Sequence, residues 1–112
     1  MRVCVIGGMS LVPFHQNKIR VHKVLSALND INRIRVLACG NVGVVNVSAE
    51  VWARSVTPQA RVVTFNVDWS SDVKAALDDF RPDLVVIFPD PLIMKYARTI
   101  TKLGYNVIKV AR

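Results

Sequence analysis

IRVLACGNVG, residues 34–43, joins an apolar run to a glycine-flanked turn, and a stretch of helical composition follows it. An apolar run of this length, bounded by charged and turn residues, is typical of a strand that is buried on both faces. Four other runs share the pattern: RVCVIG (2–7), RVVTFNV (61–67), DLVVIF (83–88) and NVIKV (106–110). The sequence therefore predicts five strands, and the quoted stretch contains the second.

Stretches with helical periodicity separate these runs. Apolar residues at helical spacing predict helices over about 16–31 and about 44–56. A third helix is expected to begin after Ser70 or Ser71, either of which is a good N-cap, and to end before Pro82. A fourth, over about 93–103, is expected to be closed by Gly104. The chain thus reads as strand and helix four times over, followed by a last strand.

Strict alternation of strands and helices with short connections predicts a parallel sheet with right-handed crossovers and helices on both faces. We therefore predict an α/β fold in which residues 1–112 form a single Rossmann-like domain, a three-layer sandwich with strand order 3-2-1-4-5. Ligands of such sheets bind beyond the carboxyl ends of the strands, where the strand order reverses. The loops GGMSLVPF (7–14), CGNVG (39–43) and FPDPL (88–92) would then converge on one crevice.

Composition limits the possible classes of protein. Apolar residues make up 52% of the chain and charged residues 21%, a balance that favours a packed core over disorder. The apolar runs are far shorter than the roughly 20 residues that span a bilayer, so no membrane segment is expected. Cys4 and Cys39 show neither a disulfide framework nor metal-type spacing. We expect both to be small buried side chains in a cytoplasmic protein, and we expect no metal or cofactor.

The net charge of +7 is unevenly spread: residues 1–56 carry seven basic and two acidic side chains (7 − 2 = +5), and residues 57–112 carry eight and six (8 − 6 = +2). An anionic partner is consistent with this balance, as is simple solubility. Two of the expected helices, the first and the fourth, carry basic clusters: Lys18, Arg20 and Lys23, and Lys95, Arg98 and Lys102. These are solvated helix faces or, alternatively, a nucleic-acid surface.

The turn at residues 39–43 has features of an anion site. Backbone amides at a helix N-terminus attract anions, and glycines let the anion approach closely. Gly40 and Gly43 suit this role, with Asn41 as an amide donor, although both glycines would also serve simply to turn the chain. The lysine of a P-loop and the three spaced glycines of a dinucleotide fingerprint are absent.

For each of the two histidines and two tryptophans, a solvated or packing side chain is weighed against a role in a site. His15 is expected in the long loop after the first strand, as a ligand contact or a solvated side chain, whereas His22 is expected to be a solvated surface residue. Trp52 and Trp69 are expected to pack helices against the sheet, and Trp69 could instead shield the rim of the crevice.

Taken in order, RVCVIGG, ACGNVG with AEVWA, VVTFNVDW, PDLVVIFPD and GYNVIKV make the chain resemble the YspA-type branch of the SLOG superfamily. These are small Rossmann-like nucleotide-binding proteins related to the DprA and LOG folds. The resemblance spans nearly the whole chain. It places Gly7 and Gly8 at the family's first glycine pair and Gly40 and Gly43 in its second motif. Its middle signature falls on Asp68 and Trp69, and its last motif begins at Phe88 and Pro89.

The departures from the family pattern indicate a degenerate member. Met9 and Ser10 stand where the family has Arg-Asp, and Asp90, Pro91 and Leu92 replace its glycine-rich turn. Val44, Val45 and Asn46 stand around its Ala-Asp pair. Asp90 is the only acid in the expected crevice loops, and a carboxylate there would repel phosphate. We therefore expect binding without catalysis.

The leading prediction is non-catalytic binding of a nucleotide or nucleotide-sugar ligand, as a sensor or a sponge for signalling nucleotides. The predicted ligand-binding residues are Gly7, Gly8, Met9, Ser10, His15, Gly40, Asn41, Gly43, Pro89 and Asp90. One alternative is binding of single-stranded nucleic acid, which the likeness to DprA and the basic helices favour. Another is a degenerate structural domain that acts in oligomerisation.

Overall fold

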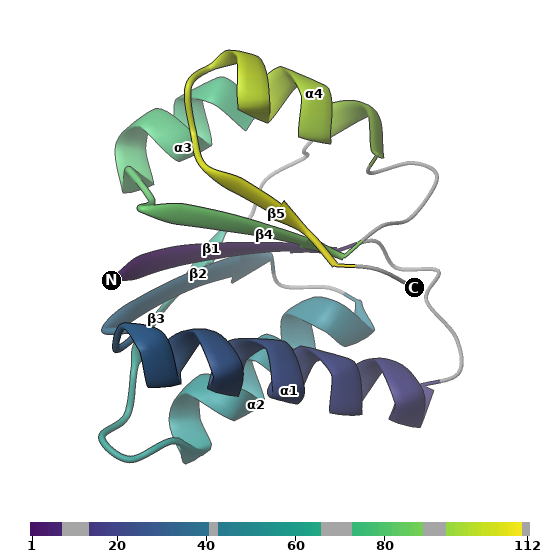
Figure 1. Cartoon of the computed structure of the whole chain (residues 1–112), viewed down its shortest axis with the longest axis vertical. Helices are drawn as coiled ribbons and strands as arrows, with labels where there is room; N and C mark the ends of the chain where they lie inside the picture. The colour runs from purple at the N-terminus through teal and green to yellow at the C-terminus, as the bar shows by residue number, and fades with distance from the viewer. Residues whose placement is uncertain (8–13, 41–42, 66–72, 89–93, 111–112) are drawn as a thin grey trace.

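The computed structural model confirms the predicted architecture and describes residues 1–7, 14–40, 43–65, 73–88 and 94–110. Its strands are β1 (Arg2–Gly7), β2 (Val36–Gly40), β3 (Arg61–Phe65), β4 (Leu84–Phe88) and β5 (Val107–Lys109). Its helices are α1 (Phe14–Ile31), α2 (Val44–Ser55), α3 (Val73–Phe80) and α4 (Met94–Lys102). The strands form one parallel sheet in the order β3-β2-β1-β4-β5, as predicted (Figure 1).

Helices cover both faces of the sheet, with α1 and α2 on one side and α3 and α4 on the other (Figure 1). Alternate residues of each strand serve the two cores that result. Val5 and Phe88 belong to the core beneath α1 and α2, while Cys4 and Ile87 belong to the core beneath α3 and α4. Burial on both faces explains why the strands read as continuous apolar runs rather than alternating ones.

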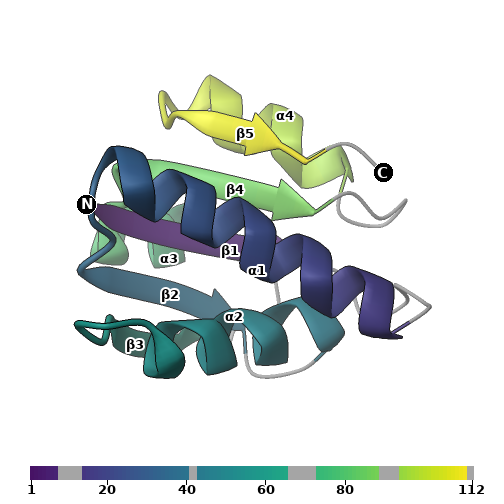
Figure 2. The ribbon, with the colours of Figure 1, turned by 60° about the horizontal axis from the view of Figure 1, so that its bottom comes forward.

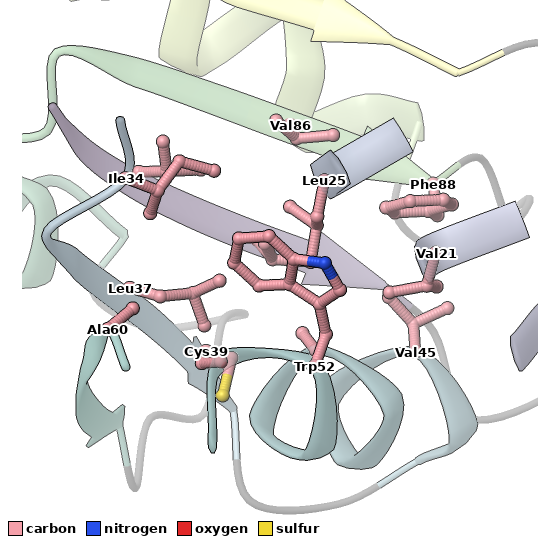
Figure 3. Packing of buried hydrophobic residues seen from close by; sticks show 14 residues of the cluster. Val21, Leu25, Ile34, Leu37, Cys39, Val45, Trp52, Ala60, Val86 and Phe88 are labelled. Carbon is pink, nitrogen blue, oxygen red and sulfur yellow. The ribbon is translucent and has the colours of Figure 1, made fainter. Parts of the chain in front are cut away.

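The larger core is organised around Trp52, which is only 4% exposed and fills the space between α1 and α2 (Figure 3). Its indole Nε1 donates a hydrogen bond of 3.0 Å to the hydroxyl of Ser26 on α1. A buried tryptophan needs a partner for its N–H group, and Ser26 supplies it across the helix pair. The packing role predicted for Trp52 is confirmed, whereas Trp69 lies outside the described residues.

Helices α3 and α4 end where the sequence predicts, and in each case the backbone conformation of a residue after the helix explains why. Gly104 follows α4 with φ of 94°, a conformation that glycine adopts without strain, and this confirms it as the closing residue. Arg81 follows α3 with φ of 53°, in the left-handed region, directly before Pro82, which cannot continue a helix. The side chain of Arg2 donates to the carbonyl of Phe80 at 3.1 and 2.7 Å and so ties the start of β1 to the end of α3.

Two expectations on α1 need correction. The helix begins at Phe14, so His15 lies in its first turn and not in a loop; Pro13 directly precedes it in the sequence, and proline favours helix starts. His22 is not simply solvated, because its Nε2 atom is buried and has no hydrogen-bond partner among the residues that the structure describes. The hydroxyl of Ser48 on α2 is likewise buried and has no hydrogen-bond partner among the described residues.

The cysteines are buried as predicted. Cys4 and Cys39 are both free thiols with no exposed surface, and they belong to the cores on opposite faces of the sheet. Within the described ranges, no helix combines the length and the apolar character that crossing a membrane requires.

Candidate functional site

The strand order reverses at β1, which pairs with β2 on one side and with β4 on the other. At the carboxyl edge of the sheet, Gly7 of β1 is directly paired with Phe88 of β4. The chain leaves β1 toward α1 and leaves β4 toward α4, and these two helices lie on opposite faces (Figure 1). This divergence is the feature that makes a ligand crevice in open α/β sheets.

Gly7 has a packing role at this edge. A Cβ atom added to it would press against Val45 Cβ and would lie 2.5 Å from Cγ1 and 2.7 Å from Cγ2 of the same side chain. Val45 is fully buried and stands in the first turn of α2. The absence of a side chain at Gly7 therefore lets the start of α2 settle directly on the end of β1.

Asn46 joins the ends of β1 and β2. Its side chain is 4% exposed, and its Oδ1 accepts a 3.0 Å hydrogen bond from the amide of Gly40. Its Nδ2 donates a 3.5 Å hydrogen bond to the carbonyl of Gly7. A Cβ atom on Gly40 would lie 3.0 Å from this Nδ2, so a side chain there would crowd the amide. One buried amide thus fixes both strand ends relative to α2.

Gly43 precedes α2 with φ of 97° and ψ of 154°, a combination that is essentially restricted to glycine. Its carbonyl accepts the first helical hydrogen bond, from the amide of Val47 at 3.0 Å, and no side chain in the described part of the chain caps the helix. The first N–H groups of an α-helix have no partner within the helix, and the helix dipole is positive at this end. The start of α2 is thus suited to an anion.

The structure brings Gly7, Gly40 and Gly43 of the predicted site to one edge of the sheet. His15 lies in the first turn of α1, which extends beyond the carboxyl ends of the strands (Figures 1 and 2). The other predicted contacts lie outside the described residues: Gly8, Met9, Ser10, Asn41, Pro89 and Asp90. All ten ligand contacts stay predictions.

Arg20 of α1 contacts the end of β4, beside the strand reversal. Its guanidinium carbon lies 6.0 Å from the centre of the Phe88 ring, within the range of a cation–π contact. Phe88 is fully buried as the last residue of β4, and Figure 3 shows its ring beside Val21 of α1. Arg20 itself is half-buried.

The other basic residues of the two predicted clusters do not gather on one surface. Lys18 and Lys23 are exposed on α1, and Arg98 and Lys102 are exposed on α4. Lys95 lies in the first turn of α4, and its side chain is not among those described. Because α1 and α4 cover opposite faces of the sheet, the two clusters are separated by its full thickness (Figure 1).

The described acidic side chains are unevenly placed along the strand direction. None of the four helices has an acidic residue in its first turn, and all of these turns lie toward the carboxyl edge. The described acidic side chains, apart from Glu50 in the middle of α2, lie toward the opposite edge: Asp30, Asp78, Asp79 and Asp83. The arginines Arg2, Arg33, Arg35, Arg54, Arg61 and Arg81 lie toward that opposite edge as well, so among the described residues it is the helix dipoles, and not the side-chain charges, that favour an anion at the carboxyl edge.

The described part of the edge carries little reactive chemistry. Cys39 precedes Gly40, but burial raises the pKa of its thiol to about 11, and the charge of Glu50 adds to the rise. The thiol is therefore neutral near pH 7 and is a poor nucleophile. Among the residues that the structure describes, no three His, Cys, Asp or Glu side chains come close enough together to hold a metal ion.

Sequence reasoning missed Asn46 as a positioning residue and did not anticipate the contact of Arg20 with Phe88. The signal for Asn46 was present, because it stands three residues after Gly43, at the N3 position where polar side chains reach back to the chain before a helix. The contact of Arg20 with Phe88 joins residues that are distant in the sequence, and no local pattern reveals it.

Comparison of the chain with models of known protein families, with curated proteins and with solved structures finds no match.

Proposed function

We propose that the protein binds a nucleotide-derived ligand at the carboxyl edge of its sheet, with a phosphate at the start of α2, and that it does not turn the ligand over. The observation that carries this proposal is the reversal of strand order between β1 and β4, at the directly paired ends Gly7 and Phe88. The start of α2 rests on the same point through Val45.

Electrostatics support an anionic ligand. Helix starts free of acidic residues surround the edge, and Arg20 lies beside the strand reversal. Anions gain from backbone amides and from the dipole at a helix N-terminus. A SLOG-type nucleotide ligand, as the sequence resemblance implies, meets both conditions through its phosphates.

Binding without turnover is proposed because hydrolysis needs an acid or a base beside the reacting centre. In the described part of the edge, Cys39 is held neutral by burial. The sequence supplies a single acid to the crevice loops, Asp90, where hydrolysis at a ribosyl centre calls for both a carboxylate and a proton donor.

The first experiment is a thermal-shift screen against mononucleotides, dinucleotides, ADP-ribose and cyclic signalling nucleotides, with short single-stranded DNA in a parallel arm. A ligand at about 100 times its dissociation constant stabilises a fold by roughly 2.7 kcal/mol, which gives a shift of several degrees in a domain of this size. A shift with one nucleotide class supports the proposal. A response to DNA alone favours nucleic-acid binding, and a flat screen in both arms favours a structural domain.

A matched pair of variants then locates the site. Val44 is the first residue of α2 and is partly buried, and Val44→Asp and Val44→Asn place nearly isosteric side chains there, of which only one is charged. A carboxylate at the start of α2 repels a phosphate, so we expect Val44→Asp to bind at least about tenfold more weakly than Val44→Asn. Equal affinities would show that the start of α2 is not the anion site.

A further inference from the structure

We infer that His22 of α1 and Ser48 of α2 form a buried site for one water molecule, which links the two helices through hydrogen bonds. The Nε2 atom of His22 and the hydroxyl oxygen of Ser48 are both buried, and neither has a hydrogen-bond partner among the described residues. The large majority of buried polar atoms have a partner, either in the protein or in ordered water. The inference concerns the packing of α1 on α2 and is independent of the proposed ligand site.

The course of the two helices places these side chains at the same level. Helix α1 follows β1 and α2 follows β2, and β1, β2 and β3 are parallel, so both helices run away from the carboxyl edge. They lie side by side on one face of the sheet (Figures 1 and 2). The hydrogen bond from Trp52 to Ser26 fixes their register. His22 and Ser48 each stand four residues before one member of this bonded pair, so they face each other one helical turn nearer to the carboxyl edge.

The hydroxyl of Ser48 differs from the other described hydroxyls in helices. A helical serine or threonine can donate to a carbonyl of the preceding turn of its own helix. Ser55 does so to the carbonyl of Trp52 at 3.0 Å, and Thr101 does so to the carbonyl of Ala97 at 2.8 Å. Ser48 makes no such bond, although it is only 2% exposed. Its hydroxyl is therefore available to a partner across the helix pair.

A single water molecule matches the two atoms. They do not hydrogen-bond to each other directly. A neutral imidazole Nε2 either donates or accepts, whereas a hydroxyl and a water can do both, so one water can serve the pair in either tautomer of His22. The neighbouring side chains in the same helices are apolar and fully buried: Val21, Leu25, Val45 and Ala49. Buried waters are typical of such places, where polar atoms would otherwise have no partner.

The bridge would be the second polar link between α1 and α2. Apolar contacts have no preferred direction, whereas hydrogen bonds have a defined geometry and so help to fix the register of two helices. The bond from Trp52 to Ser26 does this in the second half of α2. The water between His22 and Ser48 does it in the first half, one turn after Asn46 holds the ends of β1 and β2.

The first test is a double-mutant cycle measured by urea unfolding. Ser48→Ala removes the hydroxyl, and His22→Phe keeps a ring but removes the nitrogen. We expect Ser48→Ala to raise the equilibrium constant of unfolding about tenfold, because the water loses one of its partners. In the His22→Phe background the same change should raise it only about twofold or less. Ser55→Ala is the control, because it removes a hydroxyl that bonds within α2, and its effect should be the same in both backgrounds.

The second test is a high-resolution crystal structure of the wild-type protein. We expect a water oxygen within about 2.7–3.2 Å of both His22 Nε2 and the Ser48 hydroxyl. A direct hydrogen bond between the two side chains, or a Ser48 hydroxyl turned to a carbonyl of its own helix, overturns the inference. A Ser48→Ala variant more stable than the wild type also overturns it, because that result shows a hydroxyl without any partner. An equal effect of Ser48→Ala in both backgrounds does the same, since the hydroxyl then acts independently of His22.

Discussion

Replacing Gly7 by alanine tests whether the glycine that ends β1 is required by the fold itself. The new Cβ atom would press against Val45 Cβ and lie 2.5 and 2.7 Å from its two methyl carbons. Optimal separations between carbon atoms are about 3.5–4.0 Å, so one of the two elements has to move. Val45 is fully buried and its Cβ atom is itself in the clash, so the start of α2 must shift away from the sheet.

The expected cost has two parts. Forcing an extra carbon into a packed core costs roughly 1–3 kcal/mol. A shift of α2 also lengthens the hydrogen bonds of Asn46 to the Gly40 amide and the Gly7 carbonyl, now 3.0 and 3.5 Å, and each such bond contributes about 1 kcal/mol. We expect a loss of about 3 kcal/mol in the free energy of unfolding, which lowers Tm by about 12 °C at roughly 4 °C per kcal/mol.

Urea unfolding followed by circular dichroism measures this loss without any ligand. Gly104→Ala is the control, because nothing lies within 4 Å of a Cβ at that position. Its cost is confined to the positive φ, about 1 kcal/mol. Adding Val45→Gly to Gly7→Ala restores the space, so the double variant should be more stable than the two separate losses imply. A stability for Gly7→Ala within about 0.5 kcal/mol of wild type would refute the packing argument.

Three further outcomes follow from the described contacts. Burial raises the pKa of Cys4 and Cys39, so both thiols should react with Ellman's reagent at pH 8 only as fast as the native fold opens, and at once in denaturant. Asn46→Ala removes the partner of a buried amide at the end of β2 and should lower the unfolding free energy by about 2–3 kcal/mol in urea titration. The Tyr105 hydroxyl donates a 2.7 Å hydrogen bond to Asp78 and lowers the pKa of that carboxyl from its ordinary value. This stabilisation is present above the ordinary carboxyl pKa and is lost as pH falls through the lowered one, so Tyr105→Phe should raise the Asp78 pKa in an NMR titration.

The fold was predictable because its determinants are local. A strand covered on both faces appears as an apolar run, and alternation with helices restricts the sheet to few topologies. The predicted strand boundaries were less accurate where a residue is buried but is not paired with a neighbouring strand. Ile34 is buried and was included in the second strand, but its amide donates a 2.8 Å hydrogen bond to the side chain of Asn29, and β2 begins only at Val36.

The sequence predicts where the candidate site lies but not the side-chain contacts that form it. Glycines at two strand ends and before a helix indicate the carboxyl edge, yet periodicity says nothing about contacts between distant residues. The packing of Val45 on Gly7, the bridge made by Asn46 and the contact of Arg20 with Phe88 all depend on the relative placement of whole elements. For the same reason, the buried and unpartnered Nε2 of His22 was not anticipated from a helix that looked solvated at that position.

The incomplete glycine motif is compatible with the proposed function once these contacts are taken into account. On this face of the sheet, Val45 and Asn46 occupy the space that Gly7 and Gly40 leave open, so a ligand cannot approach the strand ends there. It has to lie beyond them, above the first turn of α2, where the backbone after Gly43 offers amides.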